Sequence, residues 1–110
     1  MLWLLPLLWR MDRTWRQLRH EVPWVKKSPV EYVHKHIRFS TQPIDEPERP
    51  QDLLTVLDWI GHDRMMFSPD YPHWDFDDPN VVIPQTLPQT ARDAIFSENA
   101  RSFYGLPKAG

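Results

Sequence analysis

The chain has 110 residues and a net charge of −2, a length that suits one small domain. Hydrophobic residues make up 41% of it and charged residues 25%, a balance typical of globular proteins. Because no net positive charge is present to attract nucleic acid or an anionic membrane, we expect neither as a partner. The sequence holds no cysteine, which excludes disulfides and thiolate metal sites and suits the reducing cytoplasm, the expected location.

The N-terminal stretch "MLWLLPLLWR" is far shorter than the roughly 20 apolar residues of a membrane span. It also lacks the preceding positive charge and the following small residues of a signal peptide. An apolar residue then recurs every three or four positions, at Leu7, Met11, Trp15, Leu18 and Val22. This spacing predicts an amphipathic helix over about residues 5–20, with a buried start and an end before the proline at position 23.

Residues 28–31, Ser-Pro-Val-Glu, predict the start of a second helix. Ser28 can cap this helix, proline suits its first position, and Glu31 completes a capping box. We expect the helix to run to about His34. Residues 36–42, "HIRFSTQ", then alternate apolar and polar side chains, which predicts a strand that ends at Pro43.

A third helix is predicted by the spacing of Leu53, Val56, Leu57 and Ile60. Gly61 follows where a residue in the left-handed conformation would end that helix. Residues 64–68, "RMMFS", predict a second, short, buried strand. Residues 70–84, "DYPHWDFDDPNVVIP", are then expected to form a long loop.

The last predicted element lies within residues 87–106, "LPQTARDAIFSENARSFYGL", where apolar residues stand four apart. Asn99 can cap a final short helix ending at Gly105, so we expect a break near residues 97–99. The order strand, helix, strand earlier in the chain predicts a βαβ unit with parallel strands. Such strands are normally buried within a larger sheet, so two strands alone would leave edges and faces uncovered.

Asp70 is the first candidate functional residue. It stands two residues beyond the predicted second strand, and in parallel α/β proteins functional residues gather at the carboxyl ends of strands. A carboxylate at that place can act in catalysis or bind a metal. The alternative is a loop aspartate that accepts backbone hydrogen bonds in a turn.

Three histidines near the predicted elements are further candidates for a functional role. His73 follows the rigid Tyr-Pro pair and can reach the rim of a pocket, or else it simply orders its own loop. His34 and His36 have the spacing of two zinc ligands on a strand. They precede the first strand, however, which separates them from Asp70 by roughly 15 Å at ~3.3 Å per residue. Because zinc ligands lie within about 2.3 Å of the metal, we interpret this pair as a surface helix end.

The acidic residues Asp75, Asp77 and Asp78 resemble a calcium-binding loop only superficially. An EF-hand loop needs glycine at its sixth position and glutamate at its twelfth, where this chain has Asn80 and Thr86. We therefore expect a solvated acidic loop. The chain also lacks a glycine-rich phosphate loop and a Gly-x-Ser-x-Gly motif, so it offers no candidate for nucleophilic serine or cysteine chemistry.

Two segments resemble a known family. "MFSPDYPHWDFDDP" is similar to the end of the eighth strand in the amidohydrolase-related family, and "IFSENARSFYGL" resembles that family's closing helix. The long segment "LLPLLWRMDRTWRQLRHEVPWVKKSPVEYVHKHIRFSTQP" is similar to the connection between strands six and seven. The resemblance implies that residues 1–110 are a partial amidohydrolase-related domain. It would be the C-terminal fragment of a (β/α)₈ TIM-type barrel, with about strands seven and eight and their flanking helices.

The resemblance also implies a function, that of a metal-dependent hydrolase or a related decarboxylase acting on a small-molecule substrate. Family members hold a divalent metal, often zinc, with histidines from strands one, five and six and an aspartate from strand eight. Asp70 matches that aspartate, which implies that it binds the metal and takes a proton from the attacking water. From its place behind the Tyr-Pro pair, His73 is the candidate substrate-binding residue. Pro69 departs from the family pattern, because serine or threonine is common at its position.

The histidine-bearing strands of the family have no counterpart in this sequence. Its other histidines do not match the ligand positions: His20, His34, His36 and His62. A full barrel needs about 250 residues. We therefore expect an N-terminally truncated copy that is inactive alone, does not retain the metal and self-associates through exposed apolar surface.

A second hypothesis requires no enzyme activity. The N-terminal quarter of the chain is rich in tryptophan, at Trp3, Trp9, Trp15 and Trp24. Exposed aromatic side chains mark many protein–protein interfaces. The chain would then be an interaction module that binds a partner through a tryptophan-rich helical face.

Overall fold

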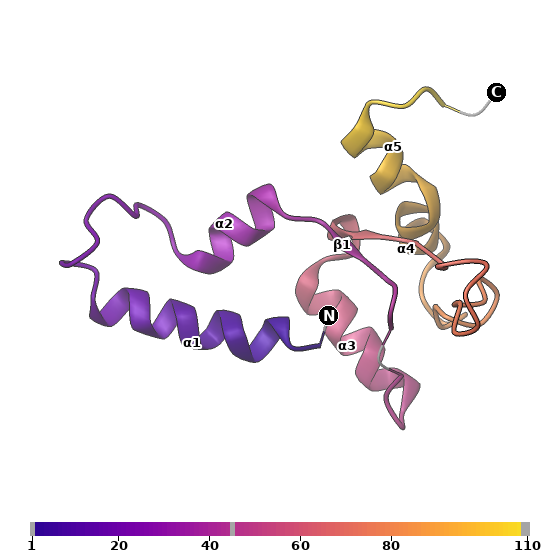
Figure 1. The fold of residues 1–110 in the computed structure, drawn as a ribbon, viewed down its shortest axis with the longest axis horizontal. Helices are drawn as coiled ribbons and strands as arrows, with labels where there is room; N and C mark the ends of the chain where they lie inside the picture. Colours follow the sequence, from indigo (N-terminus) through magenta and orange to yellow (C-terminus); the bar gives the residue numbers. More distant parts are fainter. Residues whose placement is uncertain (1, 45, 109–110) are drawn as a thin grey trace. The chain divides into compact units, whose positions relative to one another are not determined.

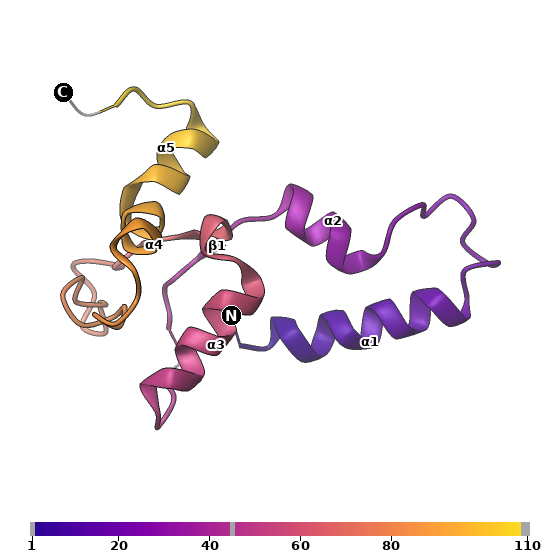
Figure 2. The same ribbon diagram turned by 180° about the vertical axis from the view of Figure 1, so that it is seen from behind.

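The computed structural model describes residues 2–44 and 46–108, and they fall into two compact units (Figures 1 and 2). The N-terminal unit comprises residues 2–37, and the C-terminal unit begins at Arg38. No helix in the described ranges is both long and apolar enough to cross a membrane.

The N-terminal unit contains two helices that lie side by side, α1 (Leu4–Gln17) and α2 (Pro29–His36) (Figure 1). α1 confirms the first predicted helix but ends about one turn early. After Gln17 the chain turns, with the Glu21 N–H bonded to the carbonyl of Leu18 at 2.9 Å. Pro23 disfavours helical backbone in the residue before it, which is consistent with this early end.

Two polar contacts hold α2 and the connecting segment against α1. The indole N–H of Trp15 donates to the carbonyl of Val25 at 3.2 Å, and Asp12 accepts from the N–H of Val30 at 3.1 Å. Between them lies an open apolar groove of about 450 Å³. The predicted apolar stripe of α1 lines this groove, so its members Leu7 and Met11 remain 43% exposed. The fully buried positions of α1 are instead Leu4 and Leu8.

The start of α2 is the predicted capping box. The Glu31 N–H donates to the Ser28 hydroxyl at 3.3 Å, and the Glu31 carboxylate accepts from the Ser28 N–H at 2.9 Å. The helix runs two residues beyond the predicted end. His34 and His36 lie in its last turn, as expected for a helix end. Residues two apart on a helix are about 200° apart around its axis, so these side chains do not share one side.

The C-terminal unit confirms the predicted βαβ order. Strand β1 (Phe39–Ser40), helix α3 (Pro50–Ile60), a short 3₁₀ helix η1 (His62–Arg64) and strand β2 (Met65–Met66) follow one another. β1 and β2 pair in parallel, with Phe39 opposite Met65 and Ser40 opposite Met66. Both strands are shorter than predicted, because α2 extends to His36 and η1 takes up Arg64.

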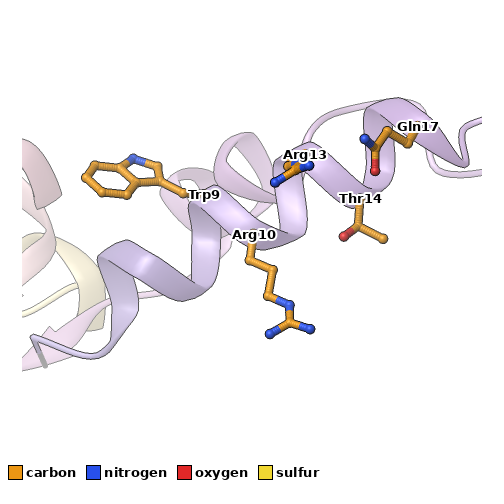
Figure 3. A pocket seen from close by; sticks show the side chains of 5 residues that line it. All are labelled: Trp9, Arg10, Arg13, Thr14 and Gln17. Carbon is orange, nitrogen blue, oxygen red and sulfur yellow. The ribbon is translucent and has the colours of Figure 1, made fainter.

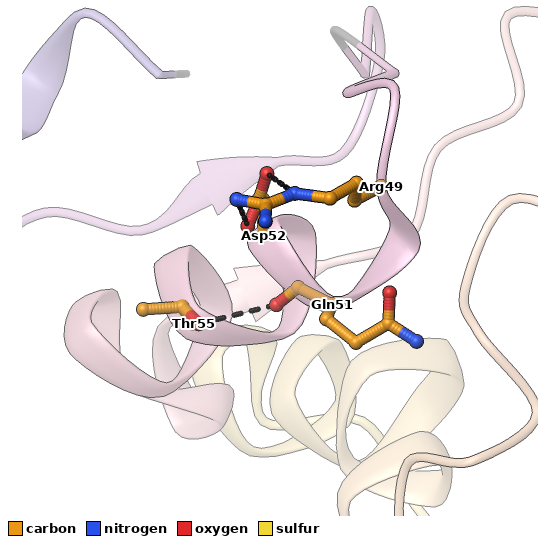
Figure 4. Close-up of polar contacts among 4 residues, drawn as sticks. All are labelled: Arg49, Gln51, Asp52 and Thr55. Atoms are coloured by element: carbon orange, nitrogen blue, oxygen red, sulfur yellow. Dashed lines mark hydrogen bonds and ion pairs between the residues drawn. The ribbon is translucent and has the colours of Figure 1, made fainter.

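Helix α3 contains the predicted apolar repeat and ends at Ile60, directly before Gly61, with proline at its first position. Figure 4 shows polar contacts at its start. Ahead of it, the Arg49 guanidinium donates to both carboxylate oxygens of Asp52, at 3.0 and 3.1 Å. Within its first turns the Thr55 hydroxyl donates to the carbonyl of Gln51 at 3.1 Å. Gly61 has the expected positive φ of 99°, but its ψ of 122° lies outside the left-handed helical region.

The C-terminal helical run contradicts the predicted break near residues 97–99. Helix α4 (Gln89–Asp93), a π-helical turn η2 (Ala94–Glu98) and helix α5 (Asn99–Tyr104) follow one another without a gap. Asn99 is helical, with φ −64° and ψ −47°, so it is not a helix cap. Gly105 ends the run in the predicted left-handed conformation.

The side chain of Asn99 has a tertiary role in place of the predicted cap. Its amide donates to the carbonyl of His62 at 2.6 Å and to that of Met65 at 2.7 Å. The π-helical turn makes a second connection, since the N–H of Phe67 donates to the carbonyl of Ile95 at 2.9 Å. The C-terminal helical run is thereby bound to both ends of β2.

The core of the C-terminal unit forms where α3, β2, the loop after residue 80 and the C-terminal helical run meet. Its most deeply buried apolar side chains are Leu57, Ile60, Met65, Ile83 and Ile95. Together these elements form a small α/β structure. The two-stranded sheet of the described residues does not close into a barrel.

Candidate functional site

The candidate site begins where the chain leaves β2. Asp70 lies four residues after Met66, not two residues after the strand as predicted, because β2 is shorter than expected. Its backbone is in the left-handed region, with φ 60°. Its carbonyl accepts from the N–H of His73 at 2.9 Å, so the chain turns back immediately. Asparagine and aspartate tolerate this conformation better than most residues, which suits an aspartate here.

Thr41 fixes the path of the chain between β2 and Asp70. Its side chain is fully buried, and its N–H donates to the carbonyl of Met66 at 3.0 Å. Its hydroxyl accepts from the N–H of Ser68 at 3.1 Å. These contacts continue the parallel pairing of β1 and β2 beyond the pairs Phe39–Met65 and Ser40–Met66. Sequence reasoning missed Thr41, although a threonine at the end of a predicted strand was a usable signal.

The turn brings three potential ligand groups together. Asp70, His73 and Asp75 each offer one atom, and these atoms all lie within 4.8 Å of one another. The Nδ1 atom of His73 is 3.8 Å from Oδ2 of Asp70. On the β1 side, the Gln42 amide donates to the carbonyl of Asp75 at 3.1 Å. All three residues are exposed on one loop.

This arrangement extends the sequence prediction. Asp70 and His73 were both expected near the site, and the structure brings them together. Asp75 was expected only as part of a solvated acidic loop; it is exposed, but its carboxylate also joins the cluster. Asp70, His73 and Asp75 are spaced three and then two positions apart, which matches no recognisable ligand motif. Only the folded loop shows that their side chains lie close together.

Asp77 lies deeper in the same loop, and its Oδ2 atom is buried without a hydrogen-bond partner in the described ranges. Burial raises the pKa of its carboxyl, and the nearby carboxylates of Glu46 and Asp75 raise that pKa further. A hydrogen bond from the backbone of Ile44 opposes these effects. The loop after β1 therefore brings the carboxylate of Glu46 close to those of Asp75 and Asp77 in the loop after β2.

The residue types in the cluster fit a divalent metal. Two carboxylates and one imidazole are ligands that zinc and similar cations accept, and catalytic zinc sites commonly have three protein ligands. His62 cannot join them from its place before β2, because Asp70 follows the other end of that strand. The cluster is therefore an open set of ligands confined to one exposed loop.

The N-terminal unit carries a separate surface hollow of about 520 Å³ on α1 (Figure 3). It is lined by Trp9, Arg10, Arg13, Thr14 and Gln17. Tryptophans six residues apart, as on α1, are rotated by about 240° around the helix axis. Trp9 and Trp15 therefore lie about 120° apart around α1, and the interaction-module hypothesis stays a prediction.

A family model for amidohydrolases matches residues 3–106, which is nearly the whole chain. A search of curated proteins finds no match.

Proposed function

Because the chain belongs to the amidohydrolase family, we propose that its 110 residues form the C-terminal portion of a TIM-type barrel domain. Members of this family are typically metal-dependent hydrolases built on such a barrel. In this proposal β1 is the seventh strand of the barrel and β2 the eighth. The parallel pairing of β1 and β2 around α3 supports the assignment, since neighbouring barrel strands are parallel and joined by a helix.

We propose Asp70 as the catalytic carboxylate and as a metal ligand. The single observation that carries this proposal is its position at the carboxyl end of β2, beside His73 and Asp75. A divalent cation such as zinc, when bound, lowers the pKa of a coordinated water toward ~7. Asp70 would take up the proton of that water and return it to the leaving group.

His73 is the proposed substrate-binding residue. Its imidazole is 68% exposed and lies 3.8 Å from the Asp70 carboxylate, so it can contact a small molecule held against that carboxylate. It would donate or accept a hydrogen bond that orients the substrate. Residues 1–110 contain no counterpart of the histidines that other family members provide from earlier strands.

We therefore infer that the isolated chain does not turn over substrate and does not retain a metal. Ligands held by one exposed loop bind weakly, because the loop loses conformational freedom when they converge. Trp3, Trp9 and Trp24 are 62%, 62% and 69% exposed, and this apolar surface can contribute to self-association.

The ligand assignment is tested by titrating Co²⁺ into the chain and following binding by calorimetry. We expect weak binding that Asp70→Asn weakens at least tenfold, because the variant replaces a charged ligand with a neutral amide. The double variant His34→Ala/His36→Ala is the control, and it should bind like the parent chain. Unchanged binding by Asp70→Asn, or loss of binding in the control, would show that the assigned ligands are wrong.

A further inference from the structure

Charge is divided unequally between the two units. Residues 2–37 hold seven lysines and arginines against three acidic residues, whereas residues 38–110 hold six against twelve. The small net charge of −2 hides this separation. Each unit therefore carries a substantial charge of its own sign.

The positive charge is concentrated on the exposed side of α1. Arg10, Arg13 and Arg16 lie within one third of the helix circumference, and all three are exposed. Figure 3 shows Arg10 and Arg13 projecting beside Trp9 at the surface hollow. None of the three arginines has a carboxylate partner within residues 2–44 and 46–108. We call these three residues the basic face.

The negative charge is concentrated at the loops that follow β1 and β2. Asp70 and Asp75 belong to the ligand cluster, and the carboxylates of Glu46 and Asp75 both act on Asp77. The cationic group paired with them is His73, which is charged only when protonated. We call the exposed residues Glu46, Asp70 and Asp75 the acidic patch.

We propose that the chain self-associates head to tail, with the basic face of one copy bound to the acidic patch of another. Guanidinium groups pair with carboxylates in a fork geometry, and the hollow between Arg10 and Arg13 leaves room for an acidic side chain. The two surfaces are different, so the contact is heterologous and can repeat from copy to copy. This inference is independent of the catalytic role proposed for Asp70.

A polyanion such as nucleic acid is the less favoured occupant of the basic face. Binding of single strands usually combines several stacking aromatic side chains with the cations, and the hollow presents Trp9 alone. The acidic C-terminal unit would also repel a second polyanion. A second copy of the chain, in contrast, carries the acidic patch as a complementary surface. This surface is present at the same concentration as the basic face.

The proposal is tested by sedimentation velocity at about 20 mM and about 500 mM NaCl, because surface charges are screened within a few ångströms at high salt. We expect oligomers at low salt and a dissociation constant at least tenfold weaker at high salt. Arg10→Glu/Arg13→Glu should be monomeric at low salt, and so should Glu46→Lys/Asp75→Lys. An equimolar mixture of these two variants should associate again, because their reversed charges are complementary.

The matched control is Lys27→Glu/Lys35→Glu, which makes the same change in charge away from the basic face and should associate like the parent chain. Circular dichroism establishes that every variant is folded. Salt-independent association would overturn the proposal and assign the contact to apolar surface. A monomer that expands with salt would also overturn it, since the charged surfaces would then pair within one chain. So would salt-dependent binding of an oligonucleotide by a chain that stays monomeric.

Discussion

The Asp77 carboxyl has an unfavourable environment for a negative charge. Its pKa is raised by burial and by the carboxylates of Glu46 and Asp75, while in the unfolded chain it would titrate near its ordinary value. Between these two pKa values the folded state binds more protons than the unfolded state. Stability therefore falls as pH rises through that interval and stays lower above it.

Replacing Asp77 with asparagine removes this penalty and keeps an oxygen for the backbone of Ile44. We expect Asp77→Asn to unfold about 2 °C higher than the parent chain at neutral pH, the shift that a fraction of a kcal/mol gives in a chain of this size. The gain should vanish below about pH 3, where the aspartate is protonated. Thermal unfolding followed by circular dichroism checks both expectations.

The control for that experiment is Asp58→Asn on the exposed side of α3. It removes the same charge away from the acidic loops and should leave the unfolding temperature unchanged. A lower unfolding temperature for Asp77→Asn at neutral pH would contradict the account, because it would mean that the charged carboxylate stabilises the fold.

At single residues, the sequence predicts chemistry better than placement. Asp70 and His73 could be proposed as site residues because they follow an apolar strand and a rigid proline, and their roles stay predictions. Asp75 could not be recognised as a neighbour of Asp70 and His73, because its approach depends on how the loop turns at Asp70 and on the contact from Gln42. Both are tertiary features with no fixed spacing in the sequence.

At the level of secondary structure, Asn99 links α5 to β2. Its side-chain amide donates to the carbonyl of His62 in η1 and to that of Met65, the first residue of β2. Asn99→Ala removes both hydrogen bonds and is expected to lower the free energy of unfolding by about 1–3 kcal/mol. Asn99→Asp should cost more, because a carboxylate would face two carbonyl oxygens.

Chemical denaturation of the two Asn99 variants tests this link. Ser102→Ala is the control on the same helix, since its exposed side chain should be replaceable within about 0.5 kcal/mol. Equal stability of all three variants would contradict the structural role given to Asn99.

Asn99 also shows where prediction of elements from sequence failed. Asparagine is a common helix cap, and that local preference predicted a break in the last helix. The two backbone carbonyls near β2 are the stronger partners, and they hold Asn99 inside a continuous helical run. By contrast, α2 and α3 were predicted well, because a capping box and an apolar repeat are local signals.

For the whole molecule, the sequence could predict the parallel βαβ unit but not the division into two units. The strand–helix–strand order fixes a parallel pairing almost by itself, since crossover connections of this kind follow a narrow set of rules. Net charge, in contrast, is an average over the chain. It led to the expectation of a weak electrostatic field, whereas the two units carry charges of opposite sign.

The central claim is that this chain supplies the carboxylate ligand Asp70 of a metal centre, and that the remaining ligands come from other barrel strands. The most direct test is the zinc content of the purified chain after exhaustive dialysis, measured by elemental analysis. Asp70, His73 and Asp75 lie on one exposed loop, so we expect less than about 0.1 zinc per chain to remain. One zinc per chain that survives dialysis would contradict the claim, because this loop alone would then form a closed and tight metal site.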